Sequence, residues 1–311
     1  MEEAAKILRQ IDRARNIVLI GHKNIDGDCL GSLLAFRQFL IKRDNKPILI
    51  SVDEPSQNLA FLPHLDQIQS NLPPNFDLLI ALDCASLSQT GFEEKLKTKK
   101  IINIDHHATN DSFGFLNLID SKAAATCQII YWLLREWGIK IDRKIAIYLL
   151  VGIMTDTGGF QYSNTTKDVL EVASDLLKYG VNIEKINRHL FGTKSLPALK
   201  IWGIVLERII KNKKYNIAAS YVTEDDLKKL GATEEDLEGI ANFMSEIPNV
   251  SAIMFISERQ GMIKGSLRST KDDIDVSVLA QMLGGGGHQK AAGFSVPGKL
   301  RIKNGKIKMI I

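Results

Sequence analysis

Aspartate and histidine side chains gather in four short segments of this 311-residue chain. The segments are Gly21–Ser32, Asp83–Ser86, Asp105–His107 and Thr155–Phe160. Several carboxylates can be buried together only when cations neutralise them, because a buried unpaired charge is very costly. A single aspartate after a strand is commonly a turn or capping residue, but four such segments favour one metal site. The candidate residues are His22, Asp26, Asp28, Asp83, Asp105, His106, His107 and Asp156.

The types of ligand indicate which metal the site would hold. Imidazole with carboxylate, without thiolate, suits Mn²⁺ or Fe²⁺ better than a structural Zn²⁺. Five aspartates and three histidines are too many for one ion, so we expect two metals about 3.5–4 Å apart, bridged by a carboxylate. Such a pair lowers the pKa of a bridging water towards about 7 and clamps an in-line displacement at phosphorus. The residues by themselves predict a dinuclear phosphoesterase.

Two cysteines, Cys29 and Cys84, lie beside candidate ligands in the sequence. A thiolate ligand would shift the preference of the site towards zinc or copper. Cys84 directly follows Asp83, and on an extended chain its side chain points the other way. We therefore interpret both cysteines as small buried hydrophobic residues. With Cys127 they are odd in number and widely spaced, which is typical of reduced cytoplasmic thiols and not of a disulfide framework.

Short apolar runs precede three of the four segments and predict the strands that would position them. Such runs, bounded by turn residues, are typical of buried strands in a mostly parallel sheet. The expected strands are 17–20, 48–52, 78–82 and 101–104, and the expected helices are 30–42, 123–137 and 141–154. This alternation predicts an α/β domain with helices on both faces of the sheet. Ligands bind at the carboxyl ends of such strands, so the first three segments should converge on one crevice.

The pattern changes in the last third of the chain. We expect residues 1–185 to form the catalytic domain, 186–205 a linker, and 206–311 a smaller α+β domain with a mixed sheet. The strands expected in this second domain are 216–222, 252–257 and 262–268. The length of the chain agrees with two domains, because about 150 residues per domain is usual.

The second domain carries two motifs that suit an anionic ligand. Gly284–Gly287 precede His288, and glycines without Cβ atoms let backbone N–H groups close on an anion, above all where a helix N-terminus follows. Their spacing is not that of an ATP-binding or NAD-binding loop. Arg268, two residues after Ser266, carries a planar fork that suits a terminal phosphate or a base edge. Each motif alone is equally typical of a surface turn or a surface charge.

The net charge of +4 is unevenly distributed. Residues 1–190 hold 22 basic and 23 acidic side chains, and residues 191–311 hold 18 and 13. The basic excess of residues 191–311 is modest, so it favours a small anionic partner over a long nucleic acid. A solvated lysine-rich surface would explain the same excess equally well. No stretch approaches the roughly 18 apolar residues that cross a membrane, and the first residues are polar and amphipathic. We expect a soluble cytoplasmic protein without membrane association.

Taken together, the motifs resemble the DHH family of phosphoesterases. Gly284–His288, with Ala291–Gly293, is similar to the associated C-terminal domain of that family, so the resemblance covers essentially the whole chain. A two-domain chain of this size is most similar to the oligoribonuclease branch, also called nanoRNases. The resemblance implies hydrolysis of RNA oligonucleotides a few nucleotides long to mononucleotides, and of pAp to AMP. Both reactions would be attacks of a metal-bound hydroxide on phosphorus.

The resemblance also implies a role for each candidate residue. One Mn²⁺ would be bound by His22, Asp26 and Asp83. The other would be bound by Asp28, Asp83, His106 and Asp156, with Asp83 bridging the two ions. Fe²⁺, Co²⁺ or Mg²⁺ would serve as substitutes.

Two residues would act on the scissile phosphate or beside it. His107 would face this phosphate, and Asp105 would orient a histidine ligand. The far end of the substrate would be bound by Ser266, Arg268, Gly285, Gly286, Gly287 and His288.

Other functions stay open from the sequence. One is a phosphodiesterase for linear or cyclic dinucleotides such as pApA, pGpG or cyclic di-AMP, and another is an inorganic pyrophosphatase. A third, of a different class, is a non-catalytic protein that binds short RNA or nucleotides, although all the expected ligand positions are intact. The preferred substrate, the polarity of cleavage, activity on DNA and the identity of the native metal also stay open at this point. An exposed helix or strand edge in the first domain would support a homodimer.

Overall fold

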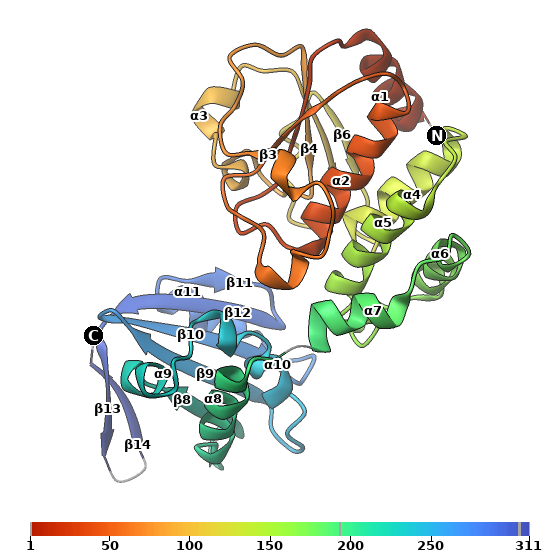
Figure 1. Cartoon of the computed structure of the whole chain (residues 1–311). Helices are drawn as coiled ribbons and strands as arrows, with labels where there is room; N and C mark the ends of the chain where they lie inside the picture. Colours follow the sequence, from red (N-terminus) through yellow and green to blue (C-terminus); the bar gives the residue numbers. More distant parts are fainter. Residues whose placement is uncertain (1, 193, 304–305, 311) are drawn as a thin grey trace. The chain divides into compact units, whose positions relative to one another are not determined.

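The computed structural model describes residues 2–192, 194–303 and 306–310. It contains two compact units, residues 1–193 and 194–311 (Figure 1). Each unit has its own hydrophobic core. The second unit includes helix α8 (Leu196–Glu207), most of which lies in the segment 186–205 expected as a linker. Ser195 caps this helix by accepting a hydrogen bond from the N–H of Ala198, and Ile201 and Val205 are part of the core of the second unit.

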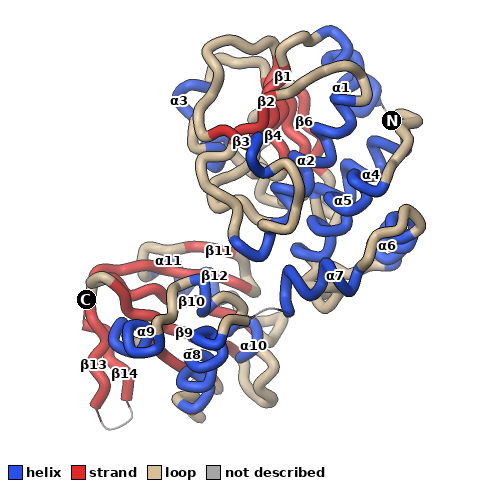
Figure 2. The backbone as a smooth tube through the Cα atoms, viewed as in Figure 1, coloured by secondary structure: helices blue, strands red, loops and turns tan. Residues whose placement is uncertain are grey.

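The first unit is built on a six-stranded sheet in the order β3-β2-β1-β4-β5-β6, and each pairing is parallel (Figure 2). The strands are β1 (Ile17–Ile20), β2 (Ile48–Ile50), β3 (Ile68–Gln69), β4 (Leu78–Leu82), β5 (Ile101–Asp105) and β6 (Leu116–Ile119). Every residue of β1 and β4 is buried, because these continuous apolar runs are covered on both faces of the sheet. The α/β fold expected from the sequence is confirmed.

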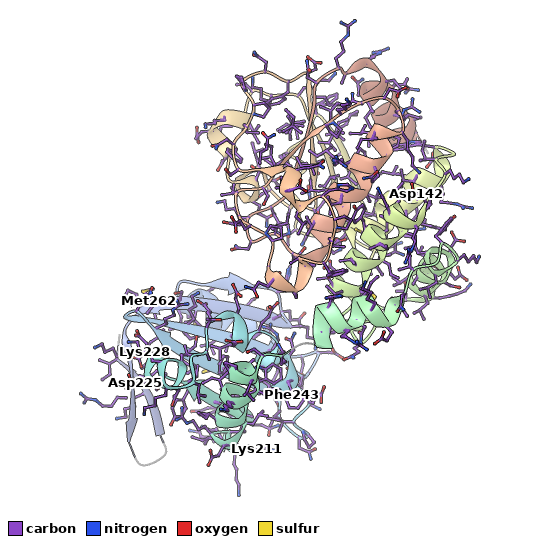
Figure 3. All side chains as sticks on the ribbon, viewed as in Figure 1. Asp142, Lys211, Asp225, Lys228, Phe243 and Met262 are labelled. Carbon is purple, nitrogen blue, oxygen red and sulfur yellow. The ribbon has the colours of Figure 1, made fainter. Side chains whose placement is uncertain are left out.

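Helices cover this sheet and form the larger core with it. They are α1 (Glu2–Arg13), α2 (Gly27–Ile41), α3 (Glu93–Leu96), α4 (Thr126–Glu136), α5 (Arg143–Asp156), α6 (Lys167–Leu177) and α7 (Ile183–Asn187). Helices α2 and α5 pack so closely that a Cβ atom on Gly31 would lie 2.4 Å from the carbonyl oxygen of Tyr148. On the other face, Leu96 of α3 and several loop side chains cover the sheet. Asp142 caps α5 by accepting a hydrogen bond from the N–H of Ile145 (Figure 3).

The order of the strands determines where a ligand can bind. β1 and β4 are neighbours, but the chain runs from β1 outward to β2 and β3, and from β4 outward to β5 and β6 in the opposite direction. A crevice forms at the carboxyl ends of the strands where this direction changes. The loops after β1 and β4 therefore lie next to each other, and these two loops hold the first two Asp/His segments.

The second unit is a mixed sheet in the order β11-β12-β10-β9-β8-β7, as expected from the sequence. Only β8 and β9 pair in parallel among its described strands. Its strands are β7 (Ile210–Asn212), β8 (Ile217–Val222), β9 (Ala252–Arg259), β10 (Met262–Ser269), β11 (Gly286–Gly287) and β12 (Ala291–Pro297), followed by the hairpin β13 (Lys299–Lys303) and β14 (Lys306–Ile310). Its other helices are α9 (Glu224–Leu230), α10 (Ile240–Met244) and α11 (Val276–Met282). Within the described part of both units, no helix combines the length and the apolar character needed to span a membrane.

Candidate active site

The four Asp/His segments meet at one edge of the first unit. Three of them follow or end strands β1, β4 and β5, and Asp156 is the last residue of α5. The Nε2 atom of His106 lies 3.2 Å from Oδ2 of Asp156 and 3.6 Å from Oδ1 of Asp83. The Nε2 atom of His22 lies 3.4 Å from the other oxygen of Asp83, Oδ2. Asp83 thus stands between two histidines and turns one carboxylate oxygen towards each.

The backbone of Asp83 explains this central position. The residue has a left-handed conformation with φ of 61°, which aspartate tolerates better than most residues, so the chain turns directly after β4. Its N–H still pairs with the carbonyl oxygen of Ile104, and its side chain is buried. The hydroxyl of Thr126 donates a hydrogen bond of 2.9 Å to Oδ1. The turn and the hydroxyl together fix the carboxylate in the middle of the cluster.

Asp28 is held by the beginning of helix α4. The N–H groups of Thr126 and Cys127 donate hydrogen bonds of 2.6 and 2.9 Å to its two carboxylate oxygens. N–H groups in the first turn of a helix have no partner within the helix, so they are available to stabilise a negative charge. The side chain is completely buried, and its Oδ2 lies 4.0 Å from Nε2 of His106.

Asp26 performs the capping role that a single aspartate commonly has. Its Oδ1 accepts hydrogen bonds of 3.0 Å from the N–H groups of Asp28 and Cys29, at the start of α2. Nε2 of His22 lies 3.7 Å from the same oxygen. Asp26 is therefore beside the cluster, but it is absent from the groups of ligand atoms that lie within 4.8 Å of one another.

Hydrogen bonds to carbonyl oxygens orient two of the histidines. Nδ1 of His22 donates to the carbonyl oxygen of Lys23 at 2.6 Å, and Nδ1 of His106 donates to that of Ala123 at 3.4 Å. A carbonyl oxygen only accepts, so Nδ1 carries a proton and Nε2 is the ring atom turned towards the carboxylates. This is the arrangement of metal-binding histidines, whose other ring nitrogen is held by an acceptor.

The electrostatics of the cluster fit a cation. Burial, and then the charges of Asp83 and Asp156, raise the pKa of Asp28 well above its usual value. Burial raises the pKa of Asp156 to about 6. In the described structure the buried Nε2 of His106 makes no hydrogen bond, although carboxylate oxygens surround it. The ligand atoms of these side chains converge on shared points, and divalent cations would neutralise the carboxylates.

The three groups of convergent ligand atoms include one cysteine. They are His22 with Cys29 and Asp83, Asp83 with His106 and His107, and Asp28 with His106 and Asp156. Burial raises the pKa of the Cys29 thiol to about 12, and the thiol donates weakly to the carbonyl oxygen of Leu82 at 3.9 Å. All three cysteines of the chain are free and buried, as the sequence predicts.

His107 is held by Asp105 at the end of β5. Its Nδ1 donates a hydrogen bond of 2.7 Å to Oδ1 of Asp105, and Asn110 donates one of 2.6 Å to Oδ2. Burial alone would raise the pKa of Asp105, but these two hydrogen bonds outweigh it and lower the pKa. The hydrogen bond to Asp105 raises the pKa of His107 in turn. Asp105 thus contacts the histidine expected at the substrate, and not His22 or His106.

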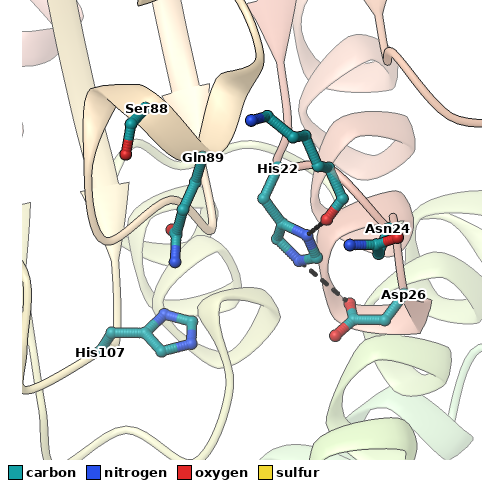
Figure 4. A pocket seen from close by; sticks show the side chains of 7 residues that line it. His22, Asn24, Asp26, Ser88, Gln89 and His107 are labelled. Atoms are coloured by element: carbon teal, nitrogen blue, oxygen red, sulfur yellow. Dashed lines mark hydrogen bonds and ion pairs between the residues drawn. The ribbon is translucent and has the colours of Figure 1, made fainter. Parts of the chain in front are cut away.

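A cavity of about 430 Å³ opens beside the cluster (Figure 4). Its walls come from the loop after β1, from the loop after β4 and from His107. It is lined by His22, Lys23, Asn24, Asp26, Ser88, Gln89 and His107.

Sequence reasoning did not find several of the residues that position or line this site. Thr126 and Asn110 hold carboxylates, and Lys23 and Gln89 line the cavity. A hydroxyl at the start of a helix and an amide three residues after His107 are common in any sequence. No signal in the sequence distinguishes them from surface residues.

In the second unit, strand pairing brings the two predicted motifs together. Arg268 of β10 lies opposite Ala291 of β12, and the backbone of His288 exchanges two hydrogen bonds with Ala291. Ser266 lies opposite Gly293, which also pairs with Gly286. The Arg268 Nε donates a hydrogen bond of 2.6 Å to Asn242.

Gly284–Gly287 follow the end of α11, and the next element after them is a strand and not a helix. The helix N-terminus that would strengthen an anion site is therefore not next to them. Gly285 crosses so close to β12 that a Cβ atom would lie 2.1 Å from the carbonyl oxygen of Gly293. Close packing of two backbones is thus one reason for glycine here.

Both units of this chain are similar in sequence to domains of known protein families. Residues 16–153 match the model of the DHH family, N-terminal domain, and residues 203–308 match the DHHA1 domain. The bifunctional oligoribonuclease and PAP phosphatase NrnA of Thermus thermophilus is 31% identical over 308 residues, which cover 96% of this chain and 89% of that protein. The protein of the same name from Bacillus subtilis is 28% identical over 294 residues, covering 94% and 92%.

A solved structure has the same fold over nearly the whole chain. An exopolyphosphatase-related protein from Bacteroides fragilis superposes with a TM-score of 0.89 at 27% identity, covering 94% of this chain and 90% of that one. The similarity therefore extends through both units. Three of the four Asp/His segments lie within the matched region 16–153, and the fourth, Thr155–Phe160, begins two residues after it. By sequence and by fold, this chain belongs to the DHH family of phosphoesterases.

Proposed function

We propose that this protein is a metal-dependent hydrolase that cleaves short RNA oligonucleotides to mononucleotides and converts pAp to AMP. The observation that carries the proposal is the placement of Asp83, whose two oxygens face His22 and His106 at 3.4 and 3.6 Å. A carboxylate between two histidines is the arrangement of a bridge between two metal ions. The curated relatives that cover nearly the whole chain are named oligoribonuclease and PAP phosphatase, which supports these two substrates.

Two Mn²⁺ ions are the cofactors that the donor set favours, because nitrogen and carboxylate oxygen predominate. His22, Asp26 and Asp83 would bind one ion. The other would be bound by Asp28, Asp83, His106 and Asp156. When bound, the ions would neutralise the carboxylates, polarise the phosphoryl group and lower the pKa of a coordinated water.

The residues of the chain itself would orient and protonate the substrate. Asp105 holds Nδ1 of His107 at 2.7 Å, so Nε2 is the ring atom left to contact the scissile phosphate or its leaving oxygen. Because Asp105 raises the pKa of His107, the imidazole keeps a proton that it can donate to that oxygen. The same charged donor would stabilise the negative charge that develops on phosphorus.

The second unit would bind the remainder of the substrate. Arg268 offers a guanidinium, Ser266 a hydroxyl, and Gly285–Gly287 with His288 offer backbone and imidazole donors, all around the β10–β12–β11 end of one sheet. Donors of this kind suit a terminal phosphate or a base edge. A short oligonucleotide carries one of each.

One assay tests the proposal. Purified protein loaded with Mn²⁺ is incubated with pAp, with pApA, pGpG and cyclic di-AMP, and with RNA oligomers from two to about ten nucleotides, and the products are separated by chromatography. We expect AMP from pAp and mononucleotides from the shortest RNAs. Cleavage of a cyclic dinucleotide alone, or binding of RNA without cleavage, would contradict the proposal.

A further inference from the structure

Gln89 links the two loops that carry candidate ligands. It lies in the 3₁₀ turn Leu87–Thr90, six residues after Asp83. Its backbone carbonyl oxygen accepts a hydrogen bond of 2.7 Å from the N–H of Lys23, in the loop after β1. Its N–H donates a hydrogen bond of 3.2 Å to the carbonyl oxygen of Ser86, in the loop after β4. The backbone of Gln89 is therefore fixed from both sides.

The side chain of Gln89 is fixed as well. Its Oε1 accepts a hydrogen bond of 2.7 Å from the N–H of Ala85, which is buried. An N–H donor must face an oxygen, so this contact decides which end of the amide is Nε2. Nε2 has no hydrogen-bond partner within the described residues. It points into the cavity, towards His107 (Figure 4).

The cavity thus has two kinds of wall. His22 and Asp26, on one wall, are candidate metal ligands. The facing wall presents the amide N–H groups of Gln89. Amide N–H groups do not bind divalent cations, because the lone pair of the nitrogen is delocalised into the carbonyl group. They bind anions.

We propose that Gln89 contacts the substrate, and that its fixed Nε2 donates a hydrogen bond to a non-bridging oxygen of the scissile phosphate. This role rests on the proposed function for its substrates. It is nevertheless a statement about phosphate, which pAp and RNA share. A donor held in place before the ligand arrives costs little reorganisation when charge develops on the phosphoryl oxygens.

The variant Gln89→Glu tests this contact. A glutamate has nearly the same shape and still accepts the hydrogen bond from Ala85, but it places a carboxylate oxygen where Nε2 was. Binding of inorganic phosphate to the Mn²⁺-loaded protein, measured by calorimetry, should weaken by about tenfold or more. Gln89→Ala, which only removes the donor, should weaken it less.

The control is Gln10→Glu, which makes the same change of charge on helix α1, where Gln10 accepts a hydrogen bond from Lys100. It should bind phosphate within about twofold of the original protein. The affinity for Mn²⁺, measured in the same experiment without phosphate, should be similar in all these proteins. Phosphate affinity unchanged in Gln89→Glu, or an equal loss of Mn²⁺ affinity, would overturn the proposal.

Phosphate binding also separates this inference from the proposed function. If the original protein cleaves neither pAp nor short RNA, the proposed substrates are wrong. A loss of phosphate affinity in Gln89→Glu would support the contact even then. If pAp is cleaved, Gln89→Ala should raise KM more than it lowers kcat when the hydrogen bond forms in the bound substrate, and should lower kcat when it forms mainly in the transition state. If neither KM nor kcat changed in Gln89→Ala, this result would argue against the contact.

Discussion

Nδ1 of His107 lies 2.7 Å from Oδ1 of Asp105, although both residues belong to the same three-residue segment. Strand β5 ends at Asp105, so its buried carboxylate stays in the sheet while His107 turns outward to the cavity. Asn110 holds the second oxygen of the carboxylate. The imidazole is therefore positioned by groups that do not line the cavity themselves.

Asp105→Asn should weaken this positioning without removing a metal ligand. We expect kcat for pAp to fall by about 10–100-fold, because groups that orient an active-site histidine typically have effects of that size. KM should change by less than about threefold, since the remaining phosphate contacts are intact. Steady-state kinetics measure both. Asp111→Asn, an exposed change in the same loop, is the control, and a dominant effect on KM would contradict the positioning role.

Asp83→Asn should abolish turnover while the protein remains folded. Asparagine tolerates the left-handed backbone and still accepts the hydrogen bond from Thr126, but it loses the charge that a bridge between two cations requires. We expect kcat to fall by about 10³-fold or more, together with the Mn²⁺ content of the protein. Asp44→Asn is the matched control, because Asp44 has the same left-handed conformation at an exposed position. Activity close to that of the original protein would exclude the bridging role.

Arg268→Ala should affect substrates according to their length. We expect KM for pAp and for RNA dimers to rise by about tenfold, because a charged hydrogen bond to the far end of the substrate is lost. Hydrolysis of a simple aryl phosphate, which has no far end, should hardly change. Arg259→Ala, an exposed arginine on strand β9, controls for the loss of a positive charge. Equal effects on all substrates would mean that Arg268 does not bind the far end.

Removal of divalent metal should stop the reaction. Treatment with EDTA should abolish turnover of pAp, Mn²⁺ should restore it, and Mg²⁺ should restore it only weakly, because the histidine ligands favour Mn²⁺. Activity of the dialysed protein at a series of metal concentrations measures this. Full activity in EDTA would refute the metal site altogether.

The second unit should lose stability in acid through Asp226. Burial would raise the pKa of this carboxyl group, but hydrogen bonds from Arg208 and Thr223 outweigh it and lower the pKa to about 2. The lowered pKa means that the ionised form stabilises the fold. This stabilisation is complete above pH of about 4 and is lost as the pH falls through about 2.

Asp226→Asn should therefore lower the free energy of unfolding by about 1–2 kcal/mol at pH 7, and the difference should shrink as the pH approaches 2. Urea unfolding followed by circular dichroism at several pH values measures it. Asp225→Asn, which changes an exposed neighbour on α9, should have little effect (Figure 3). A difference that is independent of pH would show that the charge of Asp226 is not what stabilises the unit.

Much of the fold follows from local patterns in the sequence. Strands β1 and β4 have the boundaries that their apolar runs predict, because a fully buried strand needs no alternation and ends where the Gly/Asp turns begin. Strand β6 and helix α6 were not predicted. β6 is a half-buried edge strand of four residues, and it exists because β5 offers it a partner. Local propensity carries no record of such a partner.

The sequence alone determined which chemistry is available: the histidines and aspartates after successive strands, and the metals that such donors bind. Only the tertiary structure decided the geometry. The amide groups at the start of α4 hold Asp28 from about 98 residues away, and the N–H of Ala85 turns the donor end of Gln89 into the cavity. These orientations arise from hydrogen bonds between segments that only packing brings together. The sequence specifies the types of ligand, and the fold sets the orientations of their side chains.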